Sequence, residues 1–368
     1  MNRGTISIIC LLVAAMMPAV PVLVSAAPAG MPAALAMMPA APAAGGREMT
    51  LSGGPQLVLQ HYPESKVFCI AVSVEAGSAL ESPEMRGVTH LLEHLCFDGT
   101  ERFSREQISS WVDERGAFLN AFTRKETTVY FLLAGREYLE EGIELLSQML
   151  LHSVFPEDEL AKERKVVLEE IGHSIDSPGQ ERSMFVDRYL YRGSDLTEPV
   201  IGYPATIESM SRESIAAYYH ERYRPGRMKV LLMGGFDPGS AAGWIGDYFS
   251  GPGKSGQGSL SGGVPRWSCE ITRRTSEDMA AGIDLLVPVP GVGEGDFGAV
   301  LLLEELLHSG RNPLSVALAG AGLPDAETSL EVHAGFSALR FHVDAVSGDG
   351  EGLYALPAMI GSLADWRP

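Results

Sequence analysis

The chain has 368 residues, of which 45% are hydrophobic and 20% are charged. This composition is typical of a globular protein, and the length allows two domains. Its 47 acidic residues outnumber its 28 basic residues, so the formal net charge at pH 7 is −19. A charge of this sign and size argues against nucleic acid or an anionic membrane surface as a binding partner.

The N-terminus has the pattern of a signal peptide. Arg3 precedes an apolar run over residues 6–24, and the small residues that end this run predict cleavage after Ala26. A single membrane anchor is the alternative, because the run is nearly long enough to span a bilayer. Pro18 and Pro21 interrupt the run and favour cleavage. We therefore expect an exported protein, periplasmic or secreted, that touches a membrane only if this segment stays uncleaved.

After the signal peptide at 1–26 comes an uncharged segment. Residues 27–46 are mostly Ala, Pro, Met and Gly, which predicts a disordered linker. The remaining cysteines would be Cys69, Cys96 and Cys269. An odd number leaves at least one thiol unpaired, so at most one disulfide can form.

Residues 47–248 are predicted to form an N-terminal αβ domain. Apolar patterns predict strands at 56–60, 67–75, 118–122, 127–134 and 228–235. Helical periodicity predicts helices at 87–97, 104–114, 138–154, from 156 to beyond 170, at 181–191 and at 207–223. The strand at 67–75 is apolar at nearly every position, which is typical of a strand covered on both faces. Ser104 is a good N-cap for the second helix, with Gln107 three residues later.

A Gly/Ser-rich segment at 249–265 predicts a flexible linker and the domain boundary. Beyond it, residues 266–368 repeat the same order of elements. Strands are predicted at 267–274, 283–289, 328–332 and 338–343. Helices are predicted after residue 296, after residue 313 and at 353–366.

The predicted helix at 87–97 carries the pattern H-x-x-E-H at His90, Glu93 and His94. Residues four apart share one face of a helix, so the two imidazoles can converge on one ion. Glu93 follows His90 by three residues, which places its carboxylate beside the same ion. Two neutral nitrogen ligands and a base for the bound water are what a hydrolytic metal site requires. This is the inverted zincin pattern, and it indicates a zinc peptidase or the descendant of one.

A third protein ligand is expected from a downstream cluster that contains Glu163, Glu169, Glu170 and His173. Glu163 and Glu170 are seven residues apart, two helical turns, and therefore lie on one face. Glu169 is about 100° from Glu170 and is more consistent with a solvated position. Two histidines and one glutamate leave the fourth zinc position to water, whose proton Glu93 would accept.

The alternative to a metal site is a pair of surface histidines on an amphipathic helix. The apolar residues Leu91, Leu92, Leu95 and Phe97 surround the histidines and argue against it, because partly buried polar groups need a partner such as a metal. Cys96 is about 200° round the helix from His94, so it is a poor candidate for a further ligand.

An internal repeat relates the two halves. Residues 298–306 align with 87–95, so that Leu301 falls on His90 and Glu305 on His94. A general αβ likeness is the alternative to a true duplication. The predicted fold class is α+β, with two homologous αβ halves that each pack helices on a mostly antiparallel sheet. The second half lacks the metal ligands, and we expect it to be truncated, because nothing in it matches 156–235.

Four stretches of the first half resemble the pitrilysin-type zinc metallopeptidases (family M16), which include insulin-degrading enzyme and the mitochondrial processing peptidase. They are the stretches at 87–100, 116–123, 127–130 and 163–171. The resemblance is to the bacterial and mitochondrial-processing-peptidase-like members; it covers about 56–237 well and the second half in outline.

The resemblance implies a role for each matching residue. It implies one zinc ion per chain, with His90, His94 and Glu170 as ligands and Glu93 as the catalytic base. Glu163 matches an additional glutamate that orients the site. The resemblance also implies substrate-binding residues on an edge strand that binds an extended peptide by strand addition. These residues are Asn120, Ala121 and Thr123. An ordinary strand is the alternative for these three.

The sequence therefore predicts a zinc-dependent endopeptidase that acts on peptides or unfolded segments. Three alternatives stay open. The first is a peptidase that is active only with a second, metal-free family member, as a heterodimer; a homodimer is also compatible with the resemblance. The second is a non-catalytic binding or assembly subunit that keeps the fold and the zinc. The third is a zinc enzyme of unrelated specificity.

Overall fold

The structure is a computed structural model. It describes residues 47–51, 54–175, 178–251, 282–289, 327–333 and 337–344, together with the single residues 300, 301, 303, 304, 307, 316 and 319. Residue contacts divide these into two compact units, one with 47–172 and 198–251, the other with 173–197 and the described residues from 282 onward. The predicted signal peptide, the linker at 27–46, residues 252–265 of the second linker, the strand at 267–274 and the helix at 353–366 lie outside the described residues. Among the described helices none is long and apolar enough to cross a membrane.

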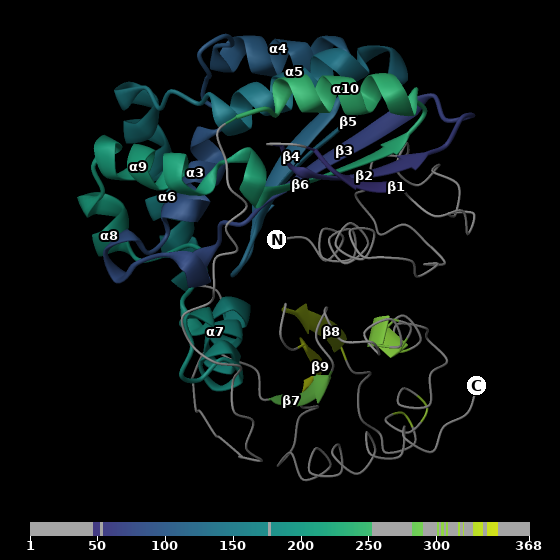
Figure 1. Ribbon diagram of the computed structural model, residues 1–368. Helices are drawn as coiled ribbons and strands as arrows, with labels where there is room; N and C mark the ends of the chain where they lie inside the picture. The colour runs from purple at the N-terminus through teal and green to yellow at the C-terminus, as the bar shows by residue number, and fades with distance from the viewer. Residues whose placement is uncertain are drawn as a thin grey trace. The chain divides into compact units, whose positions relative to one another are not determined.

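The first unit contains a six-stranded sheet (Figure 1). Its strands are β1 Arg47–Thr50, β2 Gln56–His61, β3 Val67–Val74, β4 Phe118–Thr123, β5 Thr128–Gly135 and β6 Met228–Gly234. Their order across the sheet is β1-β2-β6-β3-β5-β4. The β2–β6 pair is parallel and the other neighbours are antiparallel. The sheet is therefore mostly antiparallel, as predicted, and β4 lies at its edge.

Strand β3 lies inside the sheet between β5 and β6. Ile70 is level with Leu132 of β5 and Leu232 of β6, and all three side chains are fully buried under the helices. Ala71 points to the opposite face and is also fully buried, in a smaller apolar cluster that includes Phe131 of β5. Because both faces of β3 are covered, its nearly continuous apolar sequence is explained and the prediction is confirmed.

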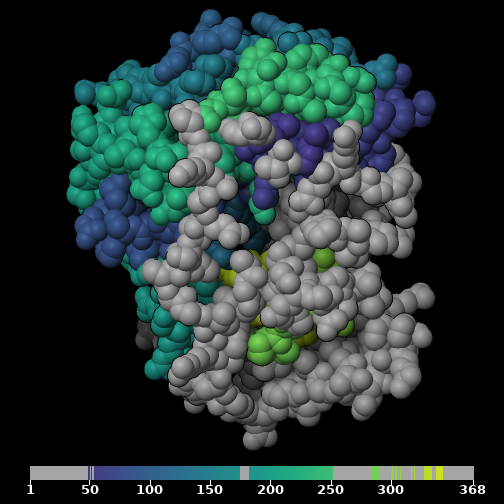
Figure 2. Space-filling model, in the orientation of Figure 1, coloured from purple at the N-terminus to yellow at the C-terminus, as the bar shows by residue number. Residues whose placement is uncertain are grey.

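Helices cover one face of this sheet. They are α3 Val88–Leu95, α4 Arg105–Glu114, α5 Leu139–Leu151, α8 Pro204–Ser209, α9 Arg212–Arg222 and α10 Pro238–Tyr248. Helix α6 Glu157–Ile175 also belongs to this unit, except for its last turn, which belongs to the second unit. Helices α5 and α10 lie side by side over the strands (Figure 1). Figure 2 shows the green atoms of α10 at the molecular surface, next to the purple atoms of the first strands. The core between these layers is formed by leucine, isoleucine, valine and aromatic side chains.

The predicted helix at 207–223 is wrong in its extent, because the structure has two helices there, α8 and α9. Met210 and Ser211 between them have extended backbone angles. The Ser211 hydroxyl accepts the Ser214 N–H at 3.2 Å, so Ser211 acts as the N-cap of α9. Arg164 donates to the carbonyl oxygens of Glu208 and Met210 at the end of α8. These side-chain hydrogen bonds stabilise the break.

Two described elements are missing from the predicted set. Strand β1 pairs with β2, and helix α10 follows β6. The start of α10 does have a sequence signal, since Asp237 accepts the Ser240 N–H at 2.8 Å and Pro238 occupies the first turn. Its glycines lower the helix propensity, so packing of Ala241 and Ile245 into the core decides it.

The second unit contains α7 Pro178–Leu190 and the strands β7 Gly282–Val289, β8 Glu327–Val332 and β9 Ser337–Asp344. The strands form an antiparallel sheet in the order β7-β9-β8. Arg182 lies 2.6 Å from His342 of β9, and the Tyr191 hydroxyl lies 2.9 Å from His333. These contacts assign 173–197 to the second unit, whereas the prediction places this segment in a domain at 47–248. The other predicted domain limits stay predictions.

Candidate metal centre

Helix α3 begins at a glycine that no other residue can replace without strain. Gly87 has a φ of 95°, in the left-handed region, and a Cβ there would lie 2.9 Å from the Gly202 Cα and 2.9 Å from the Ile201 carbonyl oxygen. The chain before α8 therefore passes directly against the start of α3. This close approach fixes where the helix begins, three residues before His90.

A buried carboxylate caps the same end of α3. Glu81 accepts the backbone N–H groups of Gly87 and Thr89, each at 2.8 Å. Burial raises the pKa of Glu81 to about 7, despite these hydrogen bonds. The Thr89 hydroxyl lies 2.9 Å from the Tyr218 hydroxyl of α9, which adds a second tie. The sequence analysis does not identify Glu81, since a cap six residues before a helix has no local signature.

The apolar face of α3 points into the core and leaves the histidines at its border. Leu91, Leu92 and Leu95 are fully buried, whereas the side chains of His90 and His94 are 18% and 20% exposed. The surrounding core therefore holds the helix rigidly, and the two imidazoles face a partly open site.

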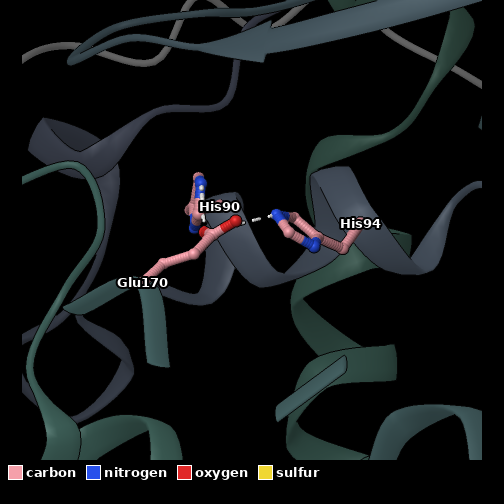
Figure 3. A group of neighbouring side chains, drawn as sticks. All are labelled: His90, His94 and Glu170. Atoms are coloured by element: carbon pink, nitrogen blue, oxygen red, sulfur yellow. Dashed lines mark ion pairs between the residues drawn. The ribbon is translucent and has the colours of Figure 1, made fainter. Parts of the chain in front are cut away.

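The structure brings His90, His94 and Glu170 together, as Figure 3 shows. The Glu170 Oε2 lies 3.8 Å from His90 Nε2 and 3.7 Å from His94 Nε2. One donor atom from each of the three lies within 4.8 Å of the others, and no second such group occurs among the described residues. Two neighbouring turns of α3 and one turn of α6 thus direct three ligand atoms to one point.

This donor set suits zinc. Bonds of about 2.0–2.1 Å to four tetrahedral ligands place neighbouring donors roughly 3.4 Å apart. The two distances from Glu170 Oε2 to the imidazole nitrogens, 3.7 and 3.8 Å, are slightly longer than this. Burial lowers the pKa of His90 to about 4, with a further contribution from His94, so its imidazole is neutral at physiological pH and can bind a metal. The Glu170 side chain is 43% exposed, which leaves solvent access to the site. Two nitrogens and one carboxylate are the ligands of an open, catalytic zinc site.

Glu163 contacts the far side of the His94 ring. Its Oε2 lies 3.0 Å from His94 Nδ1, and the Glu163 side chain is 9% exposed. Because the carboxylate accepts, Nδ1 carries the proton and Nε2 presents its lone pair toward Glu170. The seven-residue spacing placed Glu163 and Glu170 on one helix face, and the structure gives them different contacts. Glu170 lies near the Nε2 atoms of both histidines, and Glu163 orients the His94 ring.

Glu93 lies beside this group but is not part of it. The Thr123 hydroxyl donates to Glu93 Oε2 at 2.5 Å. Burial raises the pKa of Glu93, while the Thr123 hydrogen bond and the nearby His94 act to lower it. A carboxylate held in one orientation next to the ligands is placed to accept a proton. The roles of the ligands and of Glu93 stay predictions, since distances alone do not test them.

The predicted substrate-binding residues lie on the edge strand β4, as expected, but they differ in what they contact. Thr123 is buried and its hydroxyl binds Glu93. Asn120 is exposed, and its Oδ1 accepts the Ala121 N–H at 2.8 Å. Thr123 therefore holds Glu93 through its side chain, a contact between β4 and α3 that sequence spacing does not reveal.

Arg105 at the start of α4 is a further residue that the sequence analysis does not identify. Its Nη1 lies 3.1 Å from Glu163 Oε1, on the carboxylate that also contacts His94. Serine at position 104 signals the N-cap, and the capping box with Gln107 is present as predicted. Nothing in that local signal indicates a contact with α6, 58 residues downstream.

Two family models match the chain. Residues 56–203 match the insulinase family, peptidase family M16, and residues 209–345 match the peptidase M16 inactive domain. The first match contains every predicted site residue. The second covers the half in which the internal repeat has Leu301 and Glu305 in place of histidines; Glu305 lies outside the described residues.

Curated relatives agree with these models. An uncharacterized zinc protease, YmxG, of Bacillus subtilis is 32% identical over 205 residues, which is 55% of this chain and 50% of that protein. A probable mitochondrial-processing peptidase subunit beta of Schizosaccharomyces pombe is 28% identical over 265 residues, 70% of this chain and 58% of that one. The chain spans about half the length of several of the curated relatives it matches.

A solved structure shows the same fold. A protease from Helicobacter pylori superposes with a TM-score of 0.77 at 20% sequence identity, over 87% of this chain and 79% of that one. This likeness extends over both halves, and the predicted α+β class with two homologous halves is confirmed. Fold, motif and both family matches lead to one assignment: the chain belongs to peptidase family M16.

Proposed function

We propose that this chain acts as a zinc-dependent endopeptidase on peptides or unfolded protein segments. The observation that carries the proposal is the convergence of His90, His94 and Glu170, with Glu93 held beside them. A structural zinc site has four protein ligands, whereas this group offers three and an exposed side. An open position is the feature that a hydrolytic site needs.

Zinc bound by these three residues would lower the pKa of a water molecule and polarise a peptide carbonyl. Glu93 accepts the proton of the attacking water and returns it to the leaving amine. Thr123 keeps the Glu93 carboxylate in one orientation through its hydroxyl. Glu163 keeps the His94 ring in the orientation and tautomer that ligation requires.

The backbone of β4 supports binding of an extended substrate. The Arg124 N–H donates to the Thr127 carbonyl at 2.8 Å, which makes this pair hydrogen-bonded. Bonded and non-bonded pairs alternate along an antiparallel ladder, so the backbone groups of Leu119, Ala121 and Thr123 point away from β5. The Ala121 N–H binds the Asn120 side chain instead, as expected of a group that β5 does not use.

A peptide that adds to this free edge would run past Glu93, because Thr123 at the end of β4 contacts that carboxylate. The scissile bond and the base would then be neighbours. Strand addition reads backbone rather than side chains, which agrees with unfolded segments as substrates.

The test uses the full chain, purified and loaded with zinc, with a panel of quenched fluorescent peptides. We expect cleavage that a chelator stops and that added zinc restores. Cleavage that continues unchanged after the metal is removed would reject the metal-dependent mechanism. Mass spectrometry of the products would distinguish internal cleavage from trimming of peptide ends.

A second candidate is a subunit that needs a partner for activity. Two observations favour it: residues 209–345 match the model of an inactive domain, and one relative is named as a subunit beta. In that case the pure chain binds zinc and leaves all peptides intact, while addition of a second family member restores cleavage. Failure to cleave under both conditions would indicate a binding or assembly subunit.

We also propose that the mature protein is exported after cleavage behind Ala26. The proposal rests on the apolar run and the small residues at its end. N-terminal sequencing of the mature protein tests it, and an intact N-terminus on a membrane-bound product would favour the anchor instead.

A further inference from the structure

One side chain outside the proposed catalytic set stands at the centre of a carboxylate cluster. The Arg105 Nη1 lies 2.9 Å from Asp98 Oδ1, 3.0 Å from Glu159 Oε2 and 3.1 Å from Glu163 Oε1. One cation therefore bridges three acidic side chains, two of which are carried by α6. The metal ligand Glu170 lies two turns further along that helix.

The position of Arg105 in its own helix is unfavourable, which points to a tertiary role. It is the first residue of α4, where the helix dipole favours negative rather than positive charge. The surrounding carboxylates compensate for this, and they also need the arginine. Asp98 is 4% exposed, and its second oxygen has no hydrogen-bond partner among the described residues. Without a cation, three neighbouring carboxylates would repel one another.

Glu163 transmits this cluster to the metal site. Its Oε1 accepts from Arg105 and its Oε2 contacts His94 Nδ1, so each oxygen has its own partner. A carboxylate fixed at both oxygens cannot rotate, and the ring that it orients keeps Nε2 directed at Glu170. Removal of Arg105 frees one oxygen of Glu163 and leaves it facing Asp98 and Glu159.

We propose that Arg105 is a positioning residue of the metal centre, which acts through Glu163 on the orientation of His94 and thereby on zinc affinity. The inference rests on the proposed zinc site but not on peptide cleavage. It gives helix α4, which contributes no ligand, a part in positioning the metal centre. Arg105 itself is half-exposed, and none of the three carboxylates that it pairs with is a proposed metal ligand.

The variant that tests the proposal is Arg105→Met, which keeps an unbranched, flexible side chain and removes its charge. Arg102→Met is the matched control, because Arg102 is three residues earlier, is also exposed to solvent and pairs with Glu144 rather than with the cluster. Zinc affinity is measured on the full chain by competition with a chromophoric chelator. We expect Arg105→Met to lower it about tenfold, at the lower end of the effect of outer-shell partners, and Arg102→Met to leave it unchanged.

A double-mutant cycle separates positioning from general destabilisation. If Arg105 acts through Glu163, Arg105→Met should change zinc affinity little in a Glu163→Gln background. Equal losses in both backgrounds would overturn the proposed route. Arg105→Lys keeps a charge in the cluster but reaches fewer carboxylates, so we expect partial recovery.

Cobalt substitution gives a readout that a purely structural role would not change. Its visible absorption reports the ligand geometry, so Arg105→Met should alter the spectrum while near-ultraviolet circular dichroism stays that of the wild type. Unchanged affinity and spectrum in both Arg105 variants would overturn the inference and leave the proposed function intact. A wild-type chain that binds no zinc would overturn both.

Discussion

The two units each contain a histidine whose ring is held by a carboxylate, and they differ in the feature that makes one of them a candidate metal site. In the first unit His94 Nδ1 lies 3.0 Å from Glu163, and in the second His342 Nδ1 lies 3.0 Å from Asp284. Each carboxylate also accepts from an arginine. Both rings are mostly buried. Up to this point the two clusters are equivalent.

They differ at the other ring nitrogen. His94 Nε2 faces Glu170 at 3.7 Å, a carboxylate that cannot donate to it, and His90 Nε2 faces the same oxygen. His342 Nε2 instead lies 2.6 Å from Arg182, which always donates. Among the described residues no cation is paired with the Nε2 atoms of the first arrangement, whereas Arg182 supplies a positive charge in the second. The first carboxylate–histidine pair is therefore suited to bind a metal, because its second nitrogen meets a further acceptor. The second pair is suited to packing, because its second nitrogen meets a donor.

We expect the largest difference between the two clusters when one histidine is removed from each. His94→Ala should abolish zinc binding, because two ligands remain and they come from different helices. His342→Ala should keep the full metal content and affect the stability of the second unit. Elemental analysis of both purified variants decides it. Equal zinc in the two proteins would contradict the assignment of the first cluster.

The first cluster also has Glu93 beside its proposed ligands. Glu93→Gln should keep the zinc but lower kcat roughly 10²- to 10⁴-fold, the usual contribution of general acid–base catalysis. The amide keeps the shape of the side chain and can still contact Thr123, but it accepts no proton. Peptide cleavage and metal content are measured on the same sample. Activity equal to that of the wild type would end the proposed role.

The two carboxylates provide the next test. Glu163→Gln should lower zinc affinity roughly 10- to 100-fold, the range seen for outer-shell partners of ligating histidines. Asp284→Asn should leave zinc affinity unchanged. Chelator competition on both variants measures the difference, and a loss of affinity in Asp284→Asn would show that the two clusters are not independent.

We expect Asp284→Asn to lower the stability of the folded protein rather than its zinc affinity. Burial acts to raise the pKa of Asp284, but the His342 hydrogen bond and the Arg340 charge lower it below its ordinary value. A carboxylate whose pKa is lowered in the folded state stabilises that state at neutral pH and loses the effect in acid. The variant should therefore be less stable than the wild type at pH 7, and the difference should shrink as the pH falls through the pKa of Asp284. Chemical denaturation at several pH values measures this.

We expect the smallest effect from a change of Thr123, at the end of the edge strand β4. Thr123→Val removes the hydroxyl that donates to Glu93 and should lower kcat about tenfold, since a hydrogen bond to a charged group contributes about 1.5 kcal/mol. Thr127→Val in the same hairpin is the control, because the Thr127 hydroxyl binds the Val74 carbonyl instead. If Thr123→Val raises KM and leaves kcat unchanged, Thr123 serves substrate binding rather than the base.

Local patterns predicted most of the first unit. The apolar run of β3, the Ser104 capping box and the H-x-x-E-H helix each depend on residues within a few positions, and each is present. The break between α8 and α9 had one local signal, the N-cap Ser211, but Arg164 from a different helix also stabilises it. The contacts of Thr123 with Glu93 and of Arg105 with Glu163 join different elements, and no local pattern predicted them.

The sequence by itself determined that two histidines and a glutamate share one helix face, because a helical turn places residues three and four apart side by side. It also placed Glu163 and Glu170 on a common face further along the chain. The resemblance assigned Glu170 to the metal and Glu163 to a supporting role, and the structure places Glu170 near both Nε2 atoms and Glu163 at His94 Nδ1. Only the tertiary structure shows that Glu81, Thr123 and Arg105 support the site. The reason is physical: ligand geometry within a turn follows from the backbone, while partners that come from other elements meet it only through packing of the whole core.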